Sequence, residues 1–221
     1  MKFKGLFQGV VTGVIVSLSL AAVSTHAKAE APIRTVMRQL VDYYVAEGRL
    51  RYNHKIDLYF IEEDQINARA EYDGVKVRIG VFKKLLEVMS TDEALVVVCH
   101  ELGHALGELP IGNFKPEIPG RGKNPLSLEG EADYFAGKCA VDYYINFEGL
   151  DPNGAQEKAF FAAFDMFGKL HETSIDTKKA ERSTYNGINL SYPDPNCRTL
   201  SAWAGAEGKP RPKCWYNPRA R

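Results

Sequence analysis

Two histidines and a glutamate stand together in the middle of the chain, in the run H-E-L-G-H at residues 100–104. Residues four apart lie one turn above each other on a helix, so His100 and His104 could bind one metal ion. This spacing is typical of zinc sites in which the glutamate acts on a zinc-bound water as general base. Residues 95–99 are apolar, so the helix is expected to be buried, and an ion would satisfy its polar groups. We therefore predict one Zn²⁺ per chain, with Glu101 as the catalytic base.

A zinc site of this kind needs a third protein ligand. One zinc-binding pattern places a third histidine at position 110, but that residue is Pro110. The Asn-Pro pair at 124–125 predicts the start of a second helix that runs to about residue 147. On this helix Glu129 and Asp133 share a face, and Glu129 would complete the ligand set. Asp133 would accept a hydrogen bond from the far nitrogen of a ligand histidine, and Glu131 is the weaker ligand candidate.

Short elements are expected to surround these two helices. Residues 56–61 have the β-branched and aromatic character of a strand, and Asp73-Gly74 is typical of a hairpin turn. A capping box at 90–93 predicts where the motif helix begins. The expected elements are a helix over 32–47, strands over 56–61, 66–72 and 75–82, a short helix over 83–89, and helices over about 91–106 and 155–170.

The run Ile66-Asn67-Ala68, a hairpin, a helix, H-E-x-x-H and E-x-x-A-D together resemble the gluzincin metallopeptidases of the CAAX prenyl protease and HtpX type. The resemblance covers roughly residues 56–140 and extends to soluble, single-domain relatives. It implies an α+β, zincin-like fold with a small sheet, and it implies the ligands and base named above. It also implies that the strand over 75–82 is an edge strand that binds the substrate backbone, through Val77, Arg78, Ile79 and Gly80. The membrane helices of the prenyl protease are missing from this sequence, so its membrane substrates are not implied.

The group that stabilises the transition state is not fixed by these motifs. Tyr192-Pro193 stands where some relatives have His-Pro before a downstream arginine, which is a departure from the pattern. From residue type alone the candidate hydrogen-bond donors are Tyr134, His171, Tyr192 and Arg198. Tyr134 also fits a packing role, and His171 also fits a surface residue at a helix end.

The first 29 residues have the features of a signal peptide. Lys2 and Lys4 precede an apolar run over residues 6–23, and Ala-Lys-Ala at 27–29 predicts cleavage before Glu30. An uncleaved membrane anchor is the alternative. We expect an exported protein, periplasmic or secreted, with no stable membrane span after cleavage.

The rest of the chain is expected to form one domain with an extension. The zincin-like domain is assigned to residues 30–173, and residues 174–221 to an irregular segment packed on it. A bridge between Cys197 and Cys214 would staple this segment. Cys139 is another possible partner, and Cys99 is either a buried thiol or the fourth half-cystine, so three complete pairings remain open.

Composition excludes several functions. The 221 residues carry 28 Lys+Arg and 28 Asp+Glu, which gives no indication of a nucleic-acid-binding surface. We therefore expect an exported zinc metalloendopeptidase that acts on peptides or proteins, in an oligomeric state that the sequence leaves open. The alternative is a metal-containing binding or chaperone-like module with little or no turnover. The glutamate beside the histidines favours the enzyme, because a structural metal site needs no general base.

Overall fold

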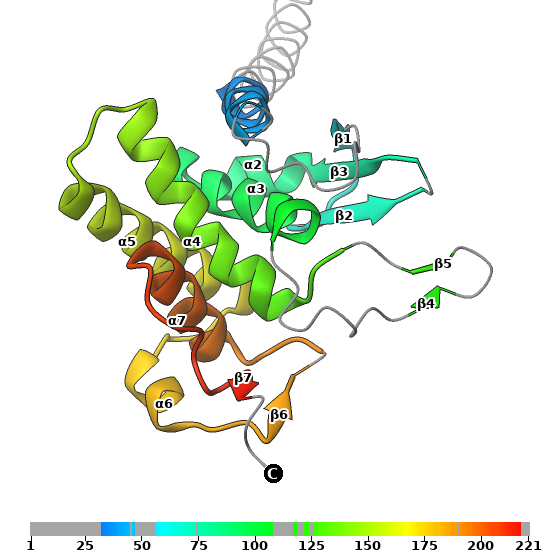
Figure 1. Cartoon of the computed structure of the whole chain (residues 1–221). Coiled ribbons are helices and arrows are strands. Elements are labelled where there is room, and N and C mark those ends of the chain that lie inside the picture. The colour runs from blue at the N-terminus through cyan, green and yellow to red at the C-terminus, as the bar shows by residue number, and fades with distance from the viewer. Residues whose placement is uncertain are drawn as a thin grey trace, which may run out of the picture.

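The computed structural model describes residues 32–44, 46, 56–73, 75–107, 117–118, 122–123, 126–189 and 191–217. The predicted signal peptide lies outside these residues, as does the Asn-Pro pair at 124–125. The described part is mixed α+β, as expected, and it is mostly helical, with a three-stranded sheet beside a group of helices and two further pairs of short strands (Figure 1). None of its helices combines the length and the apolar character that a membrane span requires.

The small sheet has three strands, β1 (Ile56–Ile61), β2 (Ala68–Tyr72) and β3 (Val77–Phe82). The order is β1-β3-β2, with β1 parallel and β2 antiparallel to β3. The predicted hairpin is therefore confirmed. The Asp73 carboxylate supports its turn, since Oδ1 accepts from the backbone N–H groups of Val75 and Lys76 at 3.0 Å.

The assignment of the substrate edge strand to Val77, Arg78, Ile79 and Gly80 is wrong. These residues lie in β3, which has a partner on each side and is the central strand. Alternating apolar residues show which face of a strand is buried, but they do not show how many neighbours the strand has. In the described sheet the strand with one unpaired edge beside the motif helix is β2 (Figure 1).

Two long helices carry the predicted ligands. α3 (Thr91–Leu106) holds the H-E-L-G-H motif, and its capping box is present: Ser90 Oγ accepts from the Glu93 backbone N–H, and Glu93 Oε2 accepts from that of Ser90. α4 (Glu129–Asn146) packs along α3, and the Cys99–Cys139 disulfide joins the two helices. The remaining helices and short strands are α2 (Lys83–Val88), α5 (Pro152–His171), α6 (Thr177–Arg182), α7 (Pro195–Ala206), β4 (Glu117–Ile118), β5 (Gly122–Lys123), β6 (Gly187–Ile188), β7 (Tyr216–Asn217) and a helix over 32–44.

The predicted start of the ligand helix at 124–125 is wrong. Residues 126–128 are not helical, and α4 begins at Glu129. The reason is a tertiary contact: the Ser127 backbone N–H donates to the carbonyl of His104 at 2.7 Å, which holds this stretch against the end of α3.

The expectation of an irregular segment after residue 173 is wrong in part. Two helices, α6 and α7, lie within it, and α7 packs against α4 and α5 (Figure 1). Asp176 and Asp194 accept hydrogen bonds from the first turns of these helices, and Pro195 occupies a first-turn position. Asp and Pro, which are common in loops, therefore cap or begin helices in this segment. The predicted Cys197–Cys214 disulfide bond is present.

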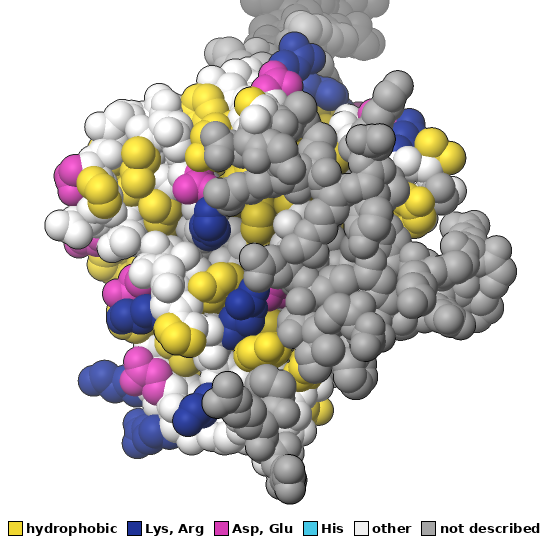
Figure 2. Space-filling model, viewed as in Figure 1, with side chains coloured by type: hydrophobic (Ala, Val, Ile, Leu, Met, Phe, Trp, Pro, Cys, Tyr) yellow, Lys and Arg dark blue, Asp and Glu magenta, His cyan; other side chains and the backbone are white. Residues whose placement is uncertain are grey.

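Charged side chains of both signs are interspersed over the described surface seen in Figure 2, which is the face formed by α4, α5, α6 and α7. The apolar side chains of α3 are covered, with Leu95, Val96 and Val98 at most 1% exposed. The motif helix thus lies inside the molecule, between the sheet and the other helices.

Candidate active site

Three side chains of α3 point toward one place in the interior. His100 and Glu101 are 7% and 5% exposed, and the rings of His100 and His104 meet edge to face with centroids 4.8 Å apart. The two imidazoles therefore share one helix face, as the spacing predicts.

The Nδ1 atom of each histidine is directed toward a hydrogen-bond acceptor. His104 Nδ1 lies 2.8 Å from the carbonyl oxygen of Ser127, which can only accept, so this nitrogen carries the proton. His100 Nδ1 lies 2.8 Å from Asp133 Oδ1, although its N–H is not well aligned with that oxygen. Both contacts leave the Nε2 atom of the ring available for another partner.

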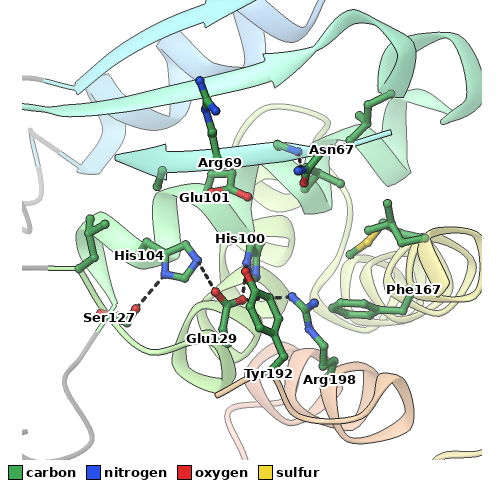
Figure 3. A pocket seen from close by; sticks show the side chains of 17 residues that line it. Asn67, Arg69, His100, Glu101, His104, Ser127, Glu129, Phe167, Tyr192 and Arg198 are labelled. Atoms are coloured by element: carbon green, nitrogen blue, oxygen red, sulfur yellow. Dashed lines mark hydrogen bonds and ion pairs between the residues drawn. The ribbon is translucent and has the colours of Figure 1, made fainter. Parts of the chain in front are cut away.

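The two Nε2 atoms converge on the carboxylate of Glu129. His100 Nε2 lies 3.4 Å from Glu129 Oε2, and His104 Nε2 lies 3.6 Å from Oε1 (Figure 3). Two ligands of one tetrahedral zinc ion are about 3.3 Å apart when the bonds are about 2.0–2.1 Å long. Glu129 Oε2 is buried without a hydrogen-bond partner among the described residues. The three side chains therefore fit a zinc ion in ligand type, spacing and unmet bonding capacity.

Asp133 is held from its other side by Arg198 of α7. Arg198 donates from Nε to Oδ2 and from Nη2 to Oδ1, both at 2.9 Å, and Asp133 is fully buried. The guanidinium also lies 4.8 Å from the ring centre of Phe167 and 5.4 Å from that of Tyr192. Arg198 was predicted only as a possible transition-state donor, and its pairing with Asp133 had no signal in the sequence.

Glycines allow the helices of the site to approach closely. A Cβ added at Gly103, between the motif histidines, would lie 2.8 Å from the backbone of Ala132 on α4. A Cβ added at Gly137 would overlap the Ala202 carbonyl oxygen, and a Cβ added at Gly205 would overlap the carbonyl oxygen of Tyr134. The contacts between α3, α4 and α7 therefore require residues without side chains at these positions.

Burial and neighbouring charges shift the titration of the site in the metal-free protein. Burial would lower the pKa of His100, but Asp133 and Glu129 outweigh it and raise the pKa to about 10. Burial, and after it the neighbouring His100, lower the pKa of His104 to about 4. Burial would raise the pKa of Glu129, yet the contact with His100 lowers it to about 2. A cation is thus already favoured beside this carboxylate, and a metal ion would replace the His100 proton.

Glu101 differs from Glu129 in its environment. Burial is the main cause that raises the pKa of Glu101 to about 7. A carboxyl group with such a pKa can accept a proton and return it near neutral pH. The residue beside the metal-ligand candidates therefore has the properties of a general base.

A pocket of about 290 Å³ opens above these groups. Residues 67–70, at the start of β2 and just before it, form one wall (Figure 3). Phe167 lies on the same side of the pocket as Asn67 (Figure 3), and the apolar residues Leu85, Val97, Met166 and Leu170 also line the pocket. The opposite end carries His104 and Ser127, so the pocket is asymmetric about Glu101 (Figure 3).

Two of the four predicted donor candidates are brought to this pocket. Tyr192 and Arg198 line it. The Tyr134 hydroxyl instead donates to the Lys209 carbonyl at 2.7 Å, at a second cavity across α4, and His171 stacks on Phe167 at the end of α5. The carbonyl of Ser127 is a site group that sequence reasoning missed, because a backbone acceptor has no residue-type signal.

Comparison with known proteins gives one match. The model of peptidase family M48 matches residues 27–110, a stretch that contains the H-E-L-G-H motif and ends before Glu129. The match spans less than half of the chain, and it supports metallopeptidase activity, since zinc dependence is general in that family. No curated protein and no solved structure matches the chain.

Proposed function

We propose that the protein is a zinc metalloendopeptidase of the M48 type, with His100, His104 and Glu129 as the metal ligands. The observation that carries the proposal is the convergence of both Nε2 atoms on the half-buried Glu129 carboxylate, with the buried Glu101 beside them. A zinc ion bound there supplies Lewis acidity, which polarises a peptide carbonyl and lowers the pKa of water.

The side chains around the ligands have separate tasks in this proposal. Glu101 takes a proton from the attacking water and passes it to the leaving amine. Tyr192, although mostly exposed, donates a hydrogen bond to the oxyanion from its hydroxyl group at the pocket. Partial desolvation of that hydroxyl, with the nearby Glu129 charge, raises its pKa to about 12, so the hydroxyl is protonated at neutral pH. Asp133, backed by Arg198, orients His100.

We propose that the substrate backbone adds to the edge of β2. Antiparallel pairing is slightly more favourable than parallel pairing, so the peptide would run opposite to β2. Its C-terminal side would then lie near Asn67, on the side of the pocket where Phe167 lies, in a pocket that Met166 and Leu170 also line. The residue that follows the scissile bond should therefore be apolar.

We also retain export as part of the proposal. The leader-like residues 1–29 support it, and two disulfides are typical of oxidising compartments rather than of the cytosol. The assignment to the CAAX prenyl protease and HtpX type within the M48 peptidases rests on the resemblance of the sequence motifs described above.

The test compares the parent with Glu101→Gln, each expressed as the full chain in an exporting host and purified. We expect about one zinc per chain in both, with cleavage of casein slower by roughly 10²–10⁴-fold in the variant. Glu157→Gln, on the exposed face of α5, is the matched control and should cleave like the parent. Zinc in both without cleavage in the parent would favour the binding-module alternative, and no zinc in the parent would reject the site.

A further inference from the structure

The Glu129 ligand lies at the start of its helix, where the backbone N–H groups have no hydrogen-bond partners within the helix. It is the first residue of α4, and the N-cap residue Leu128 offers no side-chain hydrogen bond to the first turn. Glu131 stands where a capping-box glutamate would reach back, but its carboxylate is used elsewhere. The first turn must therefore be fixed by contacts from outside the helix.

One such contact is made by Trp215, which is fully buried and lies far along the chain from α4. Its ring lies against the backbone of Gly130, the neighbour of Glu129, so that a Cβ added at Gly130 would overlap the ring atom Cδ2. The indole N–H has no hydrogen-bond partner among the described residues. Packing therefore accounts for the position of the ring.

The second contact joins Arg211 to Glu131. The guanidinium donates from Nε and Nη2 to the two carboxylate oxygens at 2.5 and 2.8 Å. Glu131 is 1% exposed, and a buried carboxylate requires such a partner. The pair therefore anchors the third residue of α4 from outside the helix.

The Cys197–Cys214 disulfide ties both contacts to α7. Cys214 precedes Trp215, and Cys197 precedes Arg198, which holds Asp133. Residues from the last quarter of the chain thus touch the first two turns of α4, at positions that include 130, 131 and 133.

We infer that Arg211 and Trp215 are positioning residues for the Glu129 ligand and set the zinc affinity, although neither lines the site pocket. The inference rests on the proposed ligand set. It assigns to the C-terminal segment the role of holding the start of α4 where Glu129 meets the two histidines.

The test measures zinc affinity by competition with a chromophoric chelator, using full-chain protein and Zn²⁺ alone. Arg211→Leu and Gly130→Ala are the test variants, the second adding one methyl group against the Trp215 ring. We expect each to bind zinc about 10–100-fold more weakly while remaining folded, as for other groups that orient a metal ligand. Lys213→Leu, exposed in the same segment, and Gly168→Ala, a helix glycine with room for a methyl group, should bind like the parent.

A purely structural role is distinguished by repeating the measurements in a Glu129→Ala background. If the two residues act through Glu129, the variants cause little further loss of zinc affinity there. Equal losses in both backgrounds, or unchanged affinity of folded Arg211→Leu and Gly130→Ala, would overturn the inference. A parent that does not bind zinc, or a Glu129→Ala variant that binds like the parent, would instead reject the proposed ligand set.

Discussion

Arg198 and Asp133 form a two-point pair in the interior, with both N–H···O distances at 2.9 Å. The same Asp133 carboxylate lies 2.8 Å from His100, so the orientation of a proposed zinc ligand depends on a residue of α7. The Arg198 charge, with that of His100, keeps the pKa of Asp133 below its ordinary value although burial would raise it.

Replacing Arg198 should affect both stability and metal binding. Arg198→Leu leaves a buried carboxylate unpaired, so the free energy of unfolding should fall by roughly 3–5 kcal/mol. Arg198→Lys keeps the charge but not the two-point geometry, and should weaken zinc binding by about 10–100-fold. Chemical unfolding and chelator competition measure the two effects. Arg182→Leu, exposed on α6, should change neither, and parent-like zinc affinity in Arg198→Lys would show that the pairing geometry does not matter.

The close contact of α4 with α7 should not tolerate a methyl group. A Cβ at Gly137 would overlap the Ala202 carbonyl oxygen, so Gly137→Ala must push the helices apart. We expect a loss of about 1–3 kcal/mol in stability. Thermal unfolding of this variant beside Gly168→Ala measures it, because the second glycine has ordinary space around it. Equal melting temperatures for Gly137→Ala and the parent would contradict the packing described here.

Tyr192→Phe removes only a hydroxyl group at the pocket. If that hydroxyl stabilises the oxyanion, kcat should fall by roughly 10²–10³-fold while KM and zinc content stay near those of the parent. Tyr185→Phe, also on the surface but not lining the pocket, is the control. An unchanged kcat in Tyr192→Phe would reject Tyr192 as the oxyanion donor. Arg198 would then be the remaining donor candidate that lines the pocket.

The apolar lining of the pocket predicts a cleavage preference. Peptides that differ only in the residue after the scissile bond should be cleaved faster with Leu than with Asp, by roughly 10–100-fold in kcat/KM. This factor corresponds to burying one apolar side chain, worth about 1.5–3 kcal/mol. Leu170→Asp should reduce the preference, since its side chain lines the pocket. A preference that instead tracks the residue before the scissile bond would reverse the proposed direction of the peptide.

Acid should destabilise the protein partly through Glu93, in the first turn of α3. Burial would raise its pKa, but hydrogen bonds from Lys169 and from the Ser90 backbone outweigh this and lower it. Ionised Glu93 therefore stabilises the fold above the unfolded-state pKa of about 4.3, and this stabilisation is lost as the pH falls through the lower folded-state value.

Unfolding experiments between about pH 7 and pH 3 should show this effect as a difference between two proteins. Glu93→Gln should be less stable than the parent at neutral pH, and the difference should shrink in acid. Glu157→Gln, exposed on α5, should follow the parent throughout. A difference that does not change with pH would exclude the proposed contribution of the ionised side chain.

Local sequence patterns were sufficient for those parts of the site that lie on one helix. The spacing of His100 and His104 fixes their common face, and the spacing of Glu129 and Asp133 does the same on α4. The capping box at Ser90 is likewise local. Each of these follows from helix geometry alone, which needs no knowledge of the neighbouring elements.

Features that depend on contacts between elements distant in the chain could not be predicted from the sequence. The alternation in β3 indicates a buried face, yet the edge next to the site belongs to β2. The start of α4 is displaced to Glu129 by a contact with the end of α3. The partner of Arg198 lies 65 residues away, and only the packing of α7 against α4 brings them together.

The support of α4 by residues 198, 211 and 215 also has a consequence for biosynthesis. A ribosome that has completed α4 has made all three proposed ligands, but none of these supports. While domains fold during translation, this site stays unsupported until residues 198–215 have emerged. Products that terminate before residue 198 would carry the H-E-L-G-H motif without a well-formed metal site, so synthesis itself would delay the appearance of the proposed hydrolytic activity in the producing cell.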